Sequence, residues 1–195
     1  MTTTVQLTNT YEPIRDNHIM NDESADWVNE FEALFEKKVA VYKRGIQKVE
    51  AMFSEEETDF LRSIGATPQE IFDFVEDWAD AGVPNPETVL ALTTIRRDYF
   101  LNVQQGKFPE TLRSEEDFPS RGASLASLDW FPRIIEKARA KLRGEMPSDL
   151  MYSCGGDRRF LNKVKISPVE FLETVREAGD NDDHIIKFVT DRSKT

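Results

Sequence analysis

The chain has 195 residues, of which 39% are hydrophobic, and it carries a formal net charge of -11 at pH 7 with a sequence pI near 4.8. No run approaches the roughly 18 apolar residues of a membrane-spanning helix, and the acidity argues against nucleic acid or an anionic membrane as partner. Cys154, the only cysteine, excludes a disulfide within the chain, and together with His18 and His184 it supplies too few ligands for a structural zinc site. The first ten residues lack a signal-peptide pattern, so we expect a cytoplasmic protein without a metal or other cofactor.

The first half of the chain predicts a polar arm followed by four helices. Residues 1–22 have no helical pattern and form the expected arm. Apolar residues then keep a helical spacing, which predicts one long helix over residues 27–53. A capping box at residues 54–57 starts a short helix. A third helix is predicted over residues 67–82, because a hydroxyl residue, a proline and a glutamate stand at its N-cap, N1 and N3 positions. A fourth helix is predicted over residues 85–100.

The second half repeats this order after a linker at residues 102–127, which we expect either to wrap across the folded parts or to be mobile. Helices are predicted from Phe131 to about Arg143 and over residues 157–163, 167–179 and 182–192. No segment shows a convincing alternation typical of β-strands. The first of these helices carries a basic stretch that predicts a solvated helix face more than a phosphate site, made of Arg133, Lys137, Arg139, Lys141 and Arg143.

An internal repeat accounts for this similarity of order. A shift of 100 residues aligns residues 31–80 with residues 131–180 without a gap and gives ten identical pairs, which include Phe31 and Phe131, Lys37 and Lys137, Leu61 and Leu161, and Pro68 and Pro168. We therefore predict an all-α fold of internally duplicated four-helix units packed into one helical domain. Its parts are an arm at 1–22, a degenerate first copy at 23–101, the linker at 102–127 and a second copy at 128–195.

The two copies differ most at residues 152–160, where the first copy has only an acidic helix start. The second copy has two glycines, a thiol, a phenol, an aspartate and two arginines there. Glycines permit close backbone approach, a helix N-terminus favours an anion, and arginine binds carboxylates or phosphates in a bidentate manner. The candidate catalytic residues are Asp157, Tyr152 and Cys154, and the candidate substrate-binding residues are Arg158, Arg159, Arg133 and Trp130.

Each of these residues also has a structural interpretation. The Gly155-Gly156 pair is typical of a tight turn. Cys154 is also consistent with a small buried apolar residue. Asp157 and Arg159 are equally consistent with a salt bridge, and His184 with a surface position at a helix start.

Three separated blocks of the second copy resemble the DUF5069 family of bacterial proteins. They are Phe118-Pro119-Ser120-Arg121, the run Asp129-Trp130-Phe131-Pro132-Arg133 with its continuation to Ala140, and Tyr152-x-Cys154-x-x-Asp157-x-Arg159-Phe160-Leu161. The resemblance covers about residues 118–190. It implies a helical fold and a functional loop, but no reaction, because the family has no assigned activity. The chain differs from the family in having Gly155-Gly156 where bulkier residues are usual.

Two functions of different classes fit these observations. The first is a small-molecule enzyme or binding protein that acts on a small anionic or aromatic metabolite through the loop at residues 152–159, with an aromatic pocket between the copies. The second is an acidic helical scaffold that binds a protein partner without catalysis. The sequence leaves open whether there is turnover. We expect a small-molecule ligand as partner, neither nucleic acid nor a membrane, and a homodimer as one possible assembly.

Overall fold

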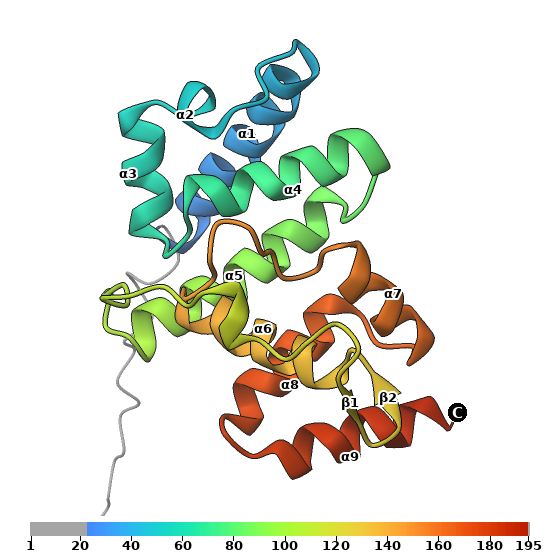
Figure 1. The fold of residues 1–195 in the computed structure, drawn as a ribbon. Coiled ribbons are helices and arrows are strands. Elements are labelled where there is room, and N and C mark those ends of the chain that lie inside the picture. The colour runs from blue at the N-terminus through green and yellow to red at the C-terminus, as the bar shows by residue number, and fades with distance from the viewer. Residues whose placement is uncertain (1–22, 195) are drawn as a thin grey trace, which may run out of the picture.

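The computed structural model describes residues 23–194, and within this range the protein is mostly helical, as predicted (Figure 1). The predicted arm at residues 1–22, with His18, lies outside the described residues. The helices and strands are α1 (Glu23–Lys43), α2 (Val49–Met52), α3 (Glu55–Ser63), α4 (Pro68–Ala81), α5 (Pro86–Asn102), a 3₁₀ turn η1 (Glu115–Asp117), β1 (Ser124–Leu125), β2 (Leu128–Asp129), α6 (Phe131–Arg143), α7 (Gly155–Lys163), α8 (Pro168–Ala178) and α9 (Asp182–Ser193).

The predicted N-caps place most helix starts correctly. The Ser54 hydroxyl accepts a hydrogen bond from the Glu57 backbone N–H and completes the capping box of α3. Thr67 and Ser167 cap α4 and α8 in the same way, each with a proline in the first helical turn. These local bonds satisfy amide groups that a helix N-terminus otherwise leaves unpaired, which is why the sequence signal is reliable here.

The long helix predicted over residues 27–53 is wrong. The α1 helix ends at Lys43, because Gly45 adopts a φ of +96° that an α-helix does not allow, and α2 then forms a separate single turn. The expectation of no strands is also corrected. Ala126 and Ser127 have φ values of 51° and 62°, and this turn pairs Ser124 with Asp129 and Leu125 with Leu128 in a small antiparallel hairpin.

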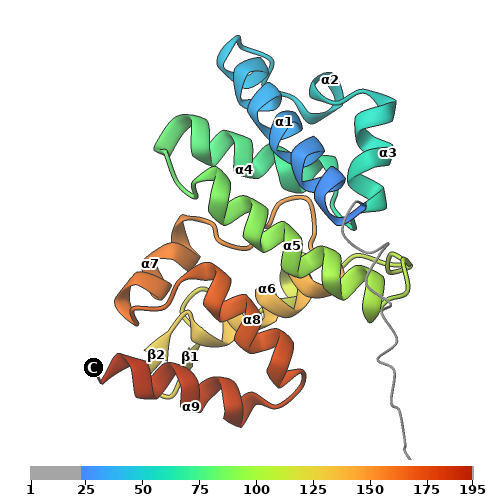
Figure 2. The ribbon, with the colours of Figure 1, turned by 180° about the vertical axis from the view of Figure 1, so that it is seen from behind.

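The helices are arranged in two halves that meet on α5. In the first half α1 packs against α4, and in the second α6 packs against α8, which also contacts α9 (Figures 1 and 2). The α5 helix packs against α1 on one side and against α6 and α8 on the other. Its inward residues Val89 and Leu92 have no exposed surface. The two halves therefore share one continuous hydrophobic core.

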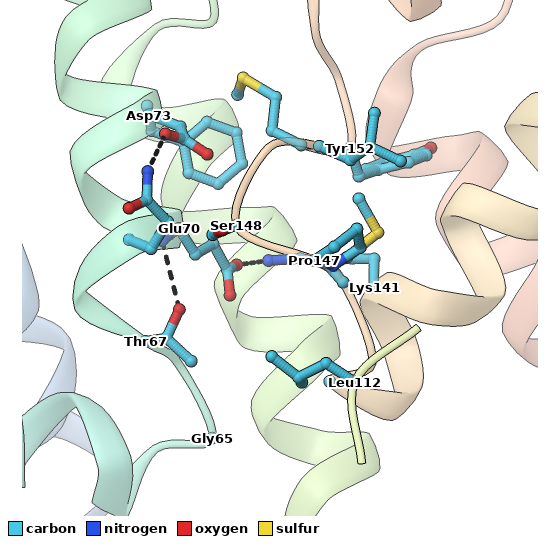
Figure 3. Close-up of a pocket in the computed structure, with 15 residues that line it drawn as sticks. Gly65, Thr67, Glu70, Asp73, Leu112, Lys141, Pro147, Ser148 and Tyr152 are labelled. Atoms are coloured by element: carbon cyan, nitrogen blue, oxygen red, sulfur yellow. Dashed lines mark hydrogen bonds and ion pairs between the residues drawn. The ribbon is translucent and has the colours of Figure 1, made fainter. Parts of the chain in front are cut away.

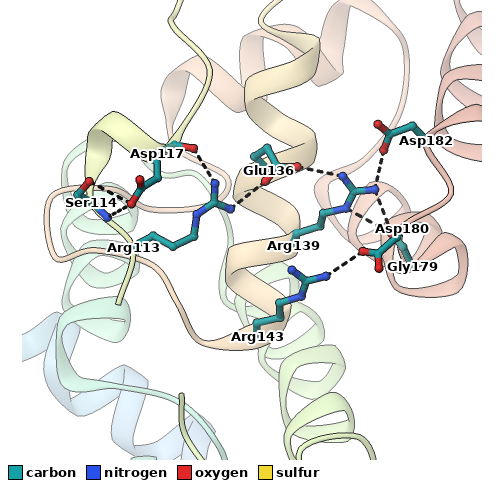
Figure 4. Close-up of polar contacts among 9 residues, drawn as sticks. All are labelled: Arg113, Ser114, Asp117, Glu136, Arg139, Arg143, Gly179, Asp180 and Asp182. Carbon is teal, nitrogen blue, oxygen red and sulfur yellow. Dashed lines mark hydrogen bonds and ion pairs between the residues drawn. The ribbon is translucent and has the colours of Figure 1, made fainter. Parts of the chain in front are cut away.

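The five basic residues of α6 do not form the predicted solvated face. Arg133, Lys137 and Lys141 are only 3%, 1% and 3% exposed, and each pairs with a carboxylate. Figure 4 shows the other two on the outer side, where Arg139 bonds Glu136, Asp182 and the Gly179 carbonyl, and Arg143 bonds Asp180. Arg113 of the linker extends this network by donating to Glu136 at 2.9 Å. The basic side chains of α6 thus form ion pairs and hydrogen bonds that connect this helix to other elements of the fold.

Candidate functional site

The loop that the sequence singles out ends in a buried charge cluster at the start of α7. Asp157 has no exposed surface and accepts three hydrogen bonds. They come from Trp130 Nε1 at 2.8 Å, Lys137 Nζ at 2.6 Å and the Ser153 backbone N–H at 2.9 Å. The partner of Asp157 is therefore Lys137, and the alternative of a salt bridge with Arg159 is wrong.

Cys154 is the N-cap residue of α7 and lies at the edge of this cluster, half-buried. Its sulfur accepts a hydrogen bond from Lys137 Nζ at 3.2 Å. Ser153, directly before it, has a φ of 69° and is fully buried. The close fit also explains Gly156, because a Cβ atom there would lie 2.4 Å from the Trp130 ring.

The candidate arginines point in different directions. Arg158 donates to Asp77 Oδ2 of α4 at 2.6 Å and to the Ser153 carbonyl at 2.5 Å, and so links the two halves. Arg133 is buried and donates to the Pro119 carbonyl and to Glu115. Arg159 is exposed and has no hydrogen-bond partner among the described residues. The structure brings Trp130, Asp157 and Cys154 together, but it does not gather the three arginines around one ligand site.

A separate cavity of about 190 Å³ lies between α4 and the chain that connects α6 to α7 (Figure 3). The ring of Tyr152 forms part of its wall, so one candidate residue faces it. The Tyr152 hydroxyl donates to the Pro168 carbonyl at 2.8 Å, and burial raises the pKa of this phenol well above its ordinary value. Apolar side chains make up much of the remaining wall, namely Phe74, Leu112, Met146, Pro147, Leu150 and Met151.

The cavity also contains an ion pair that sequence reasoning missed. Lys141 of α6 pairs with Glu70 of α4, and its ammonium lies 5.5 Å from the centre of the Phe74 ring. Burial lowers the pKa of Lys141 to about 7. The pair joins residues from the two halves, and local helix patterns contain no information about which distant carboxylate a lysine will meet.

Asp73 is the second carboxyl group of the cavity. It accepts a hydrogen bond from Gln69 Nε2 at 2.7 Å, and burial raises its pKa to about 7, with Glu76 and Asp77 adding to the effect. A sequence signal for this residue exists. Asp73 interrupts an apolar run at residues 71–75, and an acidic residue inside such a run is expected to face either a partner or a polar cavity.

Within residues 23–194, no group of three or more His, Cys, Asp or Glu residues is arranged to hold a metal ion. In the same range, no helix has the length and apolar character needed to cross a bilayer.

Comparisons with curated proteins and with solved structures gave no match. A comparison with family models gave one match, which begins at η1 and includes the whole buried charge cluster at the start of α7. Lys141 and Tyr152 of the cavity lie within this match, whereas Glu70 and Asp73 lie before it. The C-terminal part of the chain, residues 115–195, thus matches the model of DUF5069, a domain of unknown function, as the resemblance predicted.

Proposed function

We propose that this protein binds a small, mainly apolar metabolite with an aromatic or aliphatic body in the cavity between its halves. The observation that carries the proposal is the combination of an apolar wall with a few converging polar groups, Glu70, Asp73 and Lys141. A cavity of about 150 Å³ already holds a benzene ring, so a space of about 190 Å³ suits a ligand of that class. The loop at residues 152–159 contributes the ring of Tyr152.

Asp73 is the carboxyl group of the cavity with a pKa suited to exchanging a proton with a bound ligand, and the amine of Lys141 also has such a pKa. A general acid or base works best when its pKa lies near the working pH, and burial raises the pKa of Asp73 to about 7. The phenol of Tyr152 is less suited to this role, because burial raises its pKa well above 10 and its hydroxyl is already bonded to the Pro168 carbonyl. Proton transfer to or from a bound ligand would then use Asp73 of α4 or Lys141 of α6.

Thermal shift measurements against a panel of small aromatic and aliphatic metabolites test the binding proposal, because a ligand of the native state raises the melting temperature. Leu150→Trp would fill the cavity and abolish the shifts, whereas the matched variant Leu101→Trp, at an exposed position on α5, would retain them. Arg159→Ala separates the two candidate sites. Loss of binding in this variant, with binding retained in Leu150→Trp, would move the site to the α7 loop.

An acidic interaction module is the second candidate, and one surface feature favours it. A groove on α1 and α4 combines the aromatic side chains of Phe35 and Trp78 with the carboxylates of Glu32 and Glu36. Such a surface suits a basic segment with apolar residues on one side. Glu32→Lys with Glu36→Lys would abolish this binding and its salt dependence. If the affinity for the partner is the same in this double variant as in the wild type, the groove is not the binding surface.

We also propose that the two halves arose by duplication. Helices α3 and α7 begin at Glu55 and Gly155, and α4 and α8 at Pro68 and Pro168, so the shift of 100 residues is kept. A lysine of the preceding long helix pairs with the third residue of the short helix in both halves, Lys37 with Glu57 and Lys137 with Asp157. The single cysteine supports the further proposal of a cytoplasmic location.

A further inference from the structure

Asp73 is a partly buried carboxyl group, and no cation among the described residues forms an ion pair with it. Its hydrogen-bond partner is the neutral amide of Gln69 on its own helix. Two cations that approach this part of α4 form ion pairs with other carboxylates. Lys141 of α6 pairs with Glu70, and Arg158 of α7 pairs with Asp77.

The other groups around Asp73 do not compensate its charge. Glu76 and Asp77 on the same helix are acidic and disfavour ionisation of Asp73. From α1, the Tyr42 hydroxyl donates to Glu76 and Asp80 and brings no positive charge. From the loop before α7, Tyr152 presents its ring to the cavity while its hydroxyl is bonded elsewhere. Asp73 is thus the cavity's carboxyl group without a counter-charge.

We propose that the cavity binds an organic cation, with a ligand ammonium group on the Asp73 carboxylate and an aromatic or aliphatic body against Phe74, Tyr152 and the two methionines. This inference rests on the proposed function and names the ligand class of the same cavity. It accounts for the aromatic wall as well, because the face of an aromatic ring attracts a cation. An anionic ligand would instead meet two carboxyl groups and one lysine that is already paired.

The proposal has a defined pH dependence. Burial raises the pKa of Asp73 to about 7, so below pH 7 the carboxyl group is largely neutral in the empty cavity. A bound ammonium favours the ionised form, and binding must then release the proton of Asp73. The affinity for a ligand that stays cationic should therefore rise as the pH increases from 5 to 7, by up to about tenfold per pH unit. Loss of the Lys141 proton, whose pKa burial lowers to about 7, acts in the same direction.

Calorimetric titration with benzylammonium, benzyl alcohol and benzoate tests this inference, since the three share one ring and differ in charge. We expect benzylammonium to bind the wild-type protein most tightly at pH 8 and to lose at least tenfold in affinity in Asp73→Asn. The binding of benzyl alcohol should change little in this variant. The matched variant Asp59→Asn removes one exposed carboxylate of α3, far along the chain from the cavity lining, and should bind all three probes as the wild type does.

The outcomes separate this inference from the proposal on which it rests. If benzyl alcohol or benzoate binds as tightly as benzylammonium and Asp73→Asn changes nothing, the cation inference is wrong, although the cavity still binds small molecules. If none of the probes binds, both proposals fail. The pH profile of the wild type needs no variant and protects the test against misfolding of Asp73→Asn. A flat profile for benzylammonium between pH 5 and 8 would overturn the role of Asp73.

Discussion

Asp157 carries a group that can act in catalysis, but all of the hydrogen bonds that it accepts here stabilise the fold. Its two carboxylate oxygens accept from an indole, an ammonium and a backbone amide, and none of its surface is exposed. Burying an ion pair is costly, and removing one member leaves the other charge buried without compensation. The family resemblance of the Trp130, Cys154 and Asp157 blocks is therefore consistent with shared packing, whatever their role in binding.

Asp157→Asn should destabilise the protein by about 3 to 5 kcal/mol, because the Lys137 ammonium would remain buried without a carboxylate. Unfolding in urea, followed by circular dichroism, measures the loss. The double variant Asp157→Asn with Lys137→Met removes both charges and should recover much of it. If the double variant is as unstable as the sum of its single changes, the ion pair is not the source of the effect.

Asp73→Asn should change how stability depends on pH. The pKa of Asp73 is raised from 3.8 to about 7 in the folded protein, so the native state binds the extra proton between these values. The contribution of Asp73 to stability is therefore complete below about pH 4 and is lost as the pH rises through 7. Relative to the wild type, Asp73→Asn should gain stability on the order of 4 kcal/mol between pH 4 and pH 8, because each unit of the pKa difference corresponds to about 1.4 kcal/mol. Urea unfolding at both pH values measures this, and an equal difference at the two would contradict it.

At the scale of single elements, α7 has two adjacent glycines with different surroundings. A Cβ at Gly156 would lie 2.4 Å from the Trp130 ring, whereas at Gly155 the nearest such atom, the end of the Arg158 side chain, would be 3.9 Å away. Gly156→Ala should cost about 1 to 3 kcal/mol through overpacking. Gly155→Ala should be neutral or stabilise by up to about 1 kcal/mol, because alanine favours a helix. Thermal unfolding of the two variants measures this difference. Equal melting temperatures would contradict a close contact between Gly156 and the Trp130 ring.

The elements were predictable from sequence where their signals are local. Capping boxes and N-terminal prolines fixed the starts of α3, α4 and α8 because these bonds join residues three apart. Apolar spacing alone did not reveal the end of α1, since it continues past Gly45. The hairpin of β1 and β2 has only two residues on each strand, too few for an alternation to be recognised.

The candidate site was predictable only in part. A comparison of the two halves of the sequence drew attention to residues 152–160, and Tyr152 of this stretch lines the cavity. The direction of Arg158 toward Asp77 and the pairing of Lys141 with Glu70 depend on how the halves pack, so they could not be derived from either half alone. Asp73 was overlooked because α4 otherwise reads as an ordinary amphipathic helix.

At the scale of the whole molecule, α5 makes the two halves interdependent. It covers α6 and α8 with a fully buried face, and Arg96 from this face donates to the Leu142 carbonyl at 2.8 Å. A fragment of residues 115–195, the family-matched part, would expose that surface to water. We expect it to lack a cooperative thermal transition, whereas the full chain should unfold in one step. Calorimetry of both tests this, and a cooperative fragment would show that the second half folds alone.

The acidic protein has a cationic interior, and this affects its chemical reactivity. Lys38, Lys137 and Lys141 are buried, whereas Asp157 is the one buried acidic residue among those described. The outer surface is therefore more negative than the net charge of -11 implies. An amine-directed acylating reagent should modify the folded chain as though Lys38 and Lys137 were missing. Mass spectrometry can follow the slower modification of these buried lysines, and its rate would report how often the core opens.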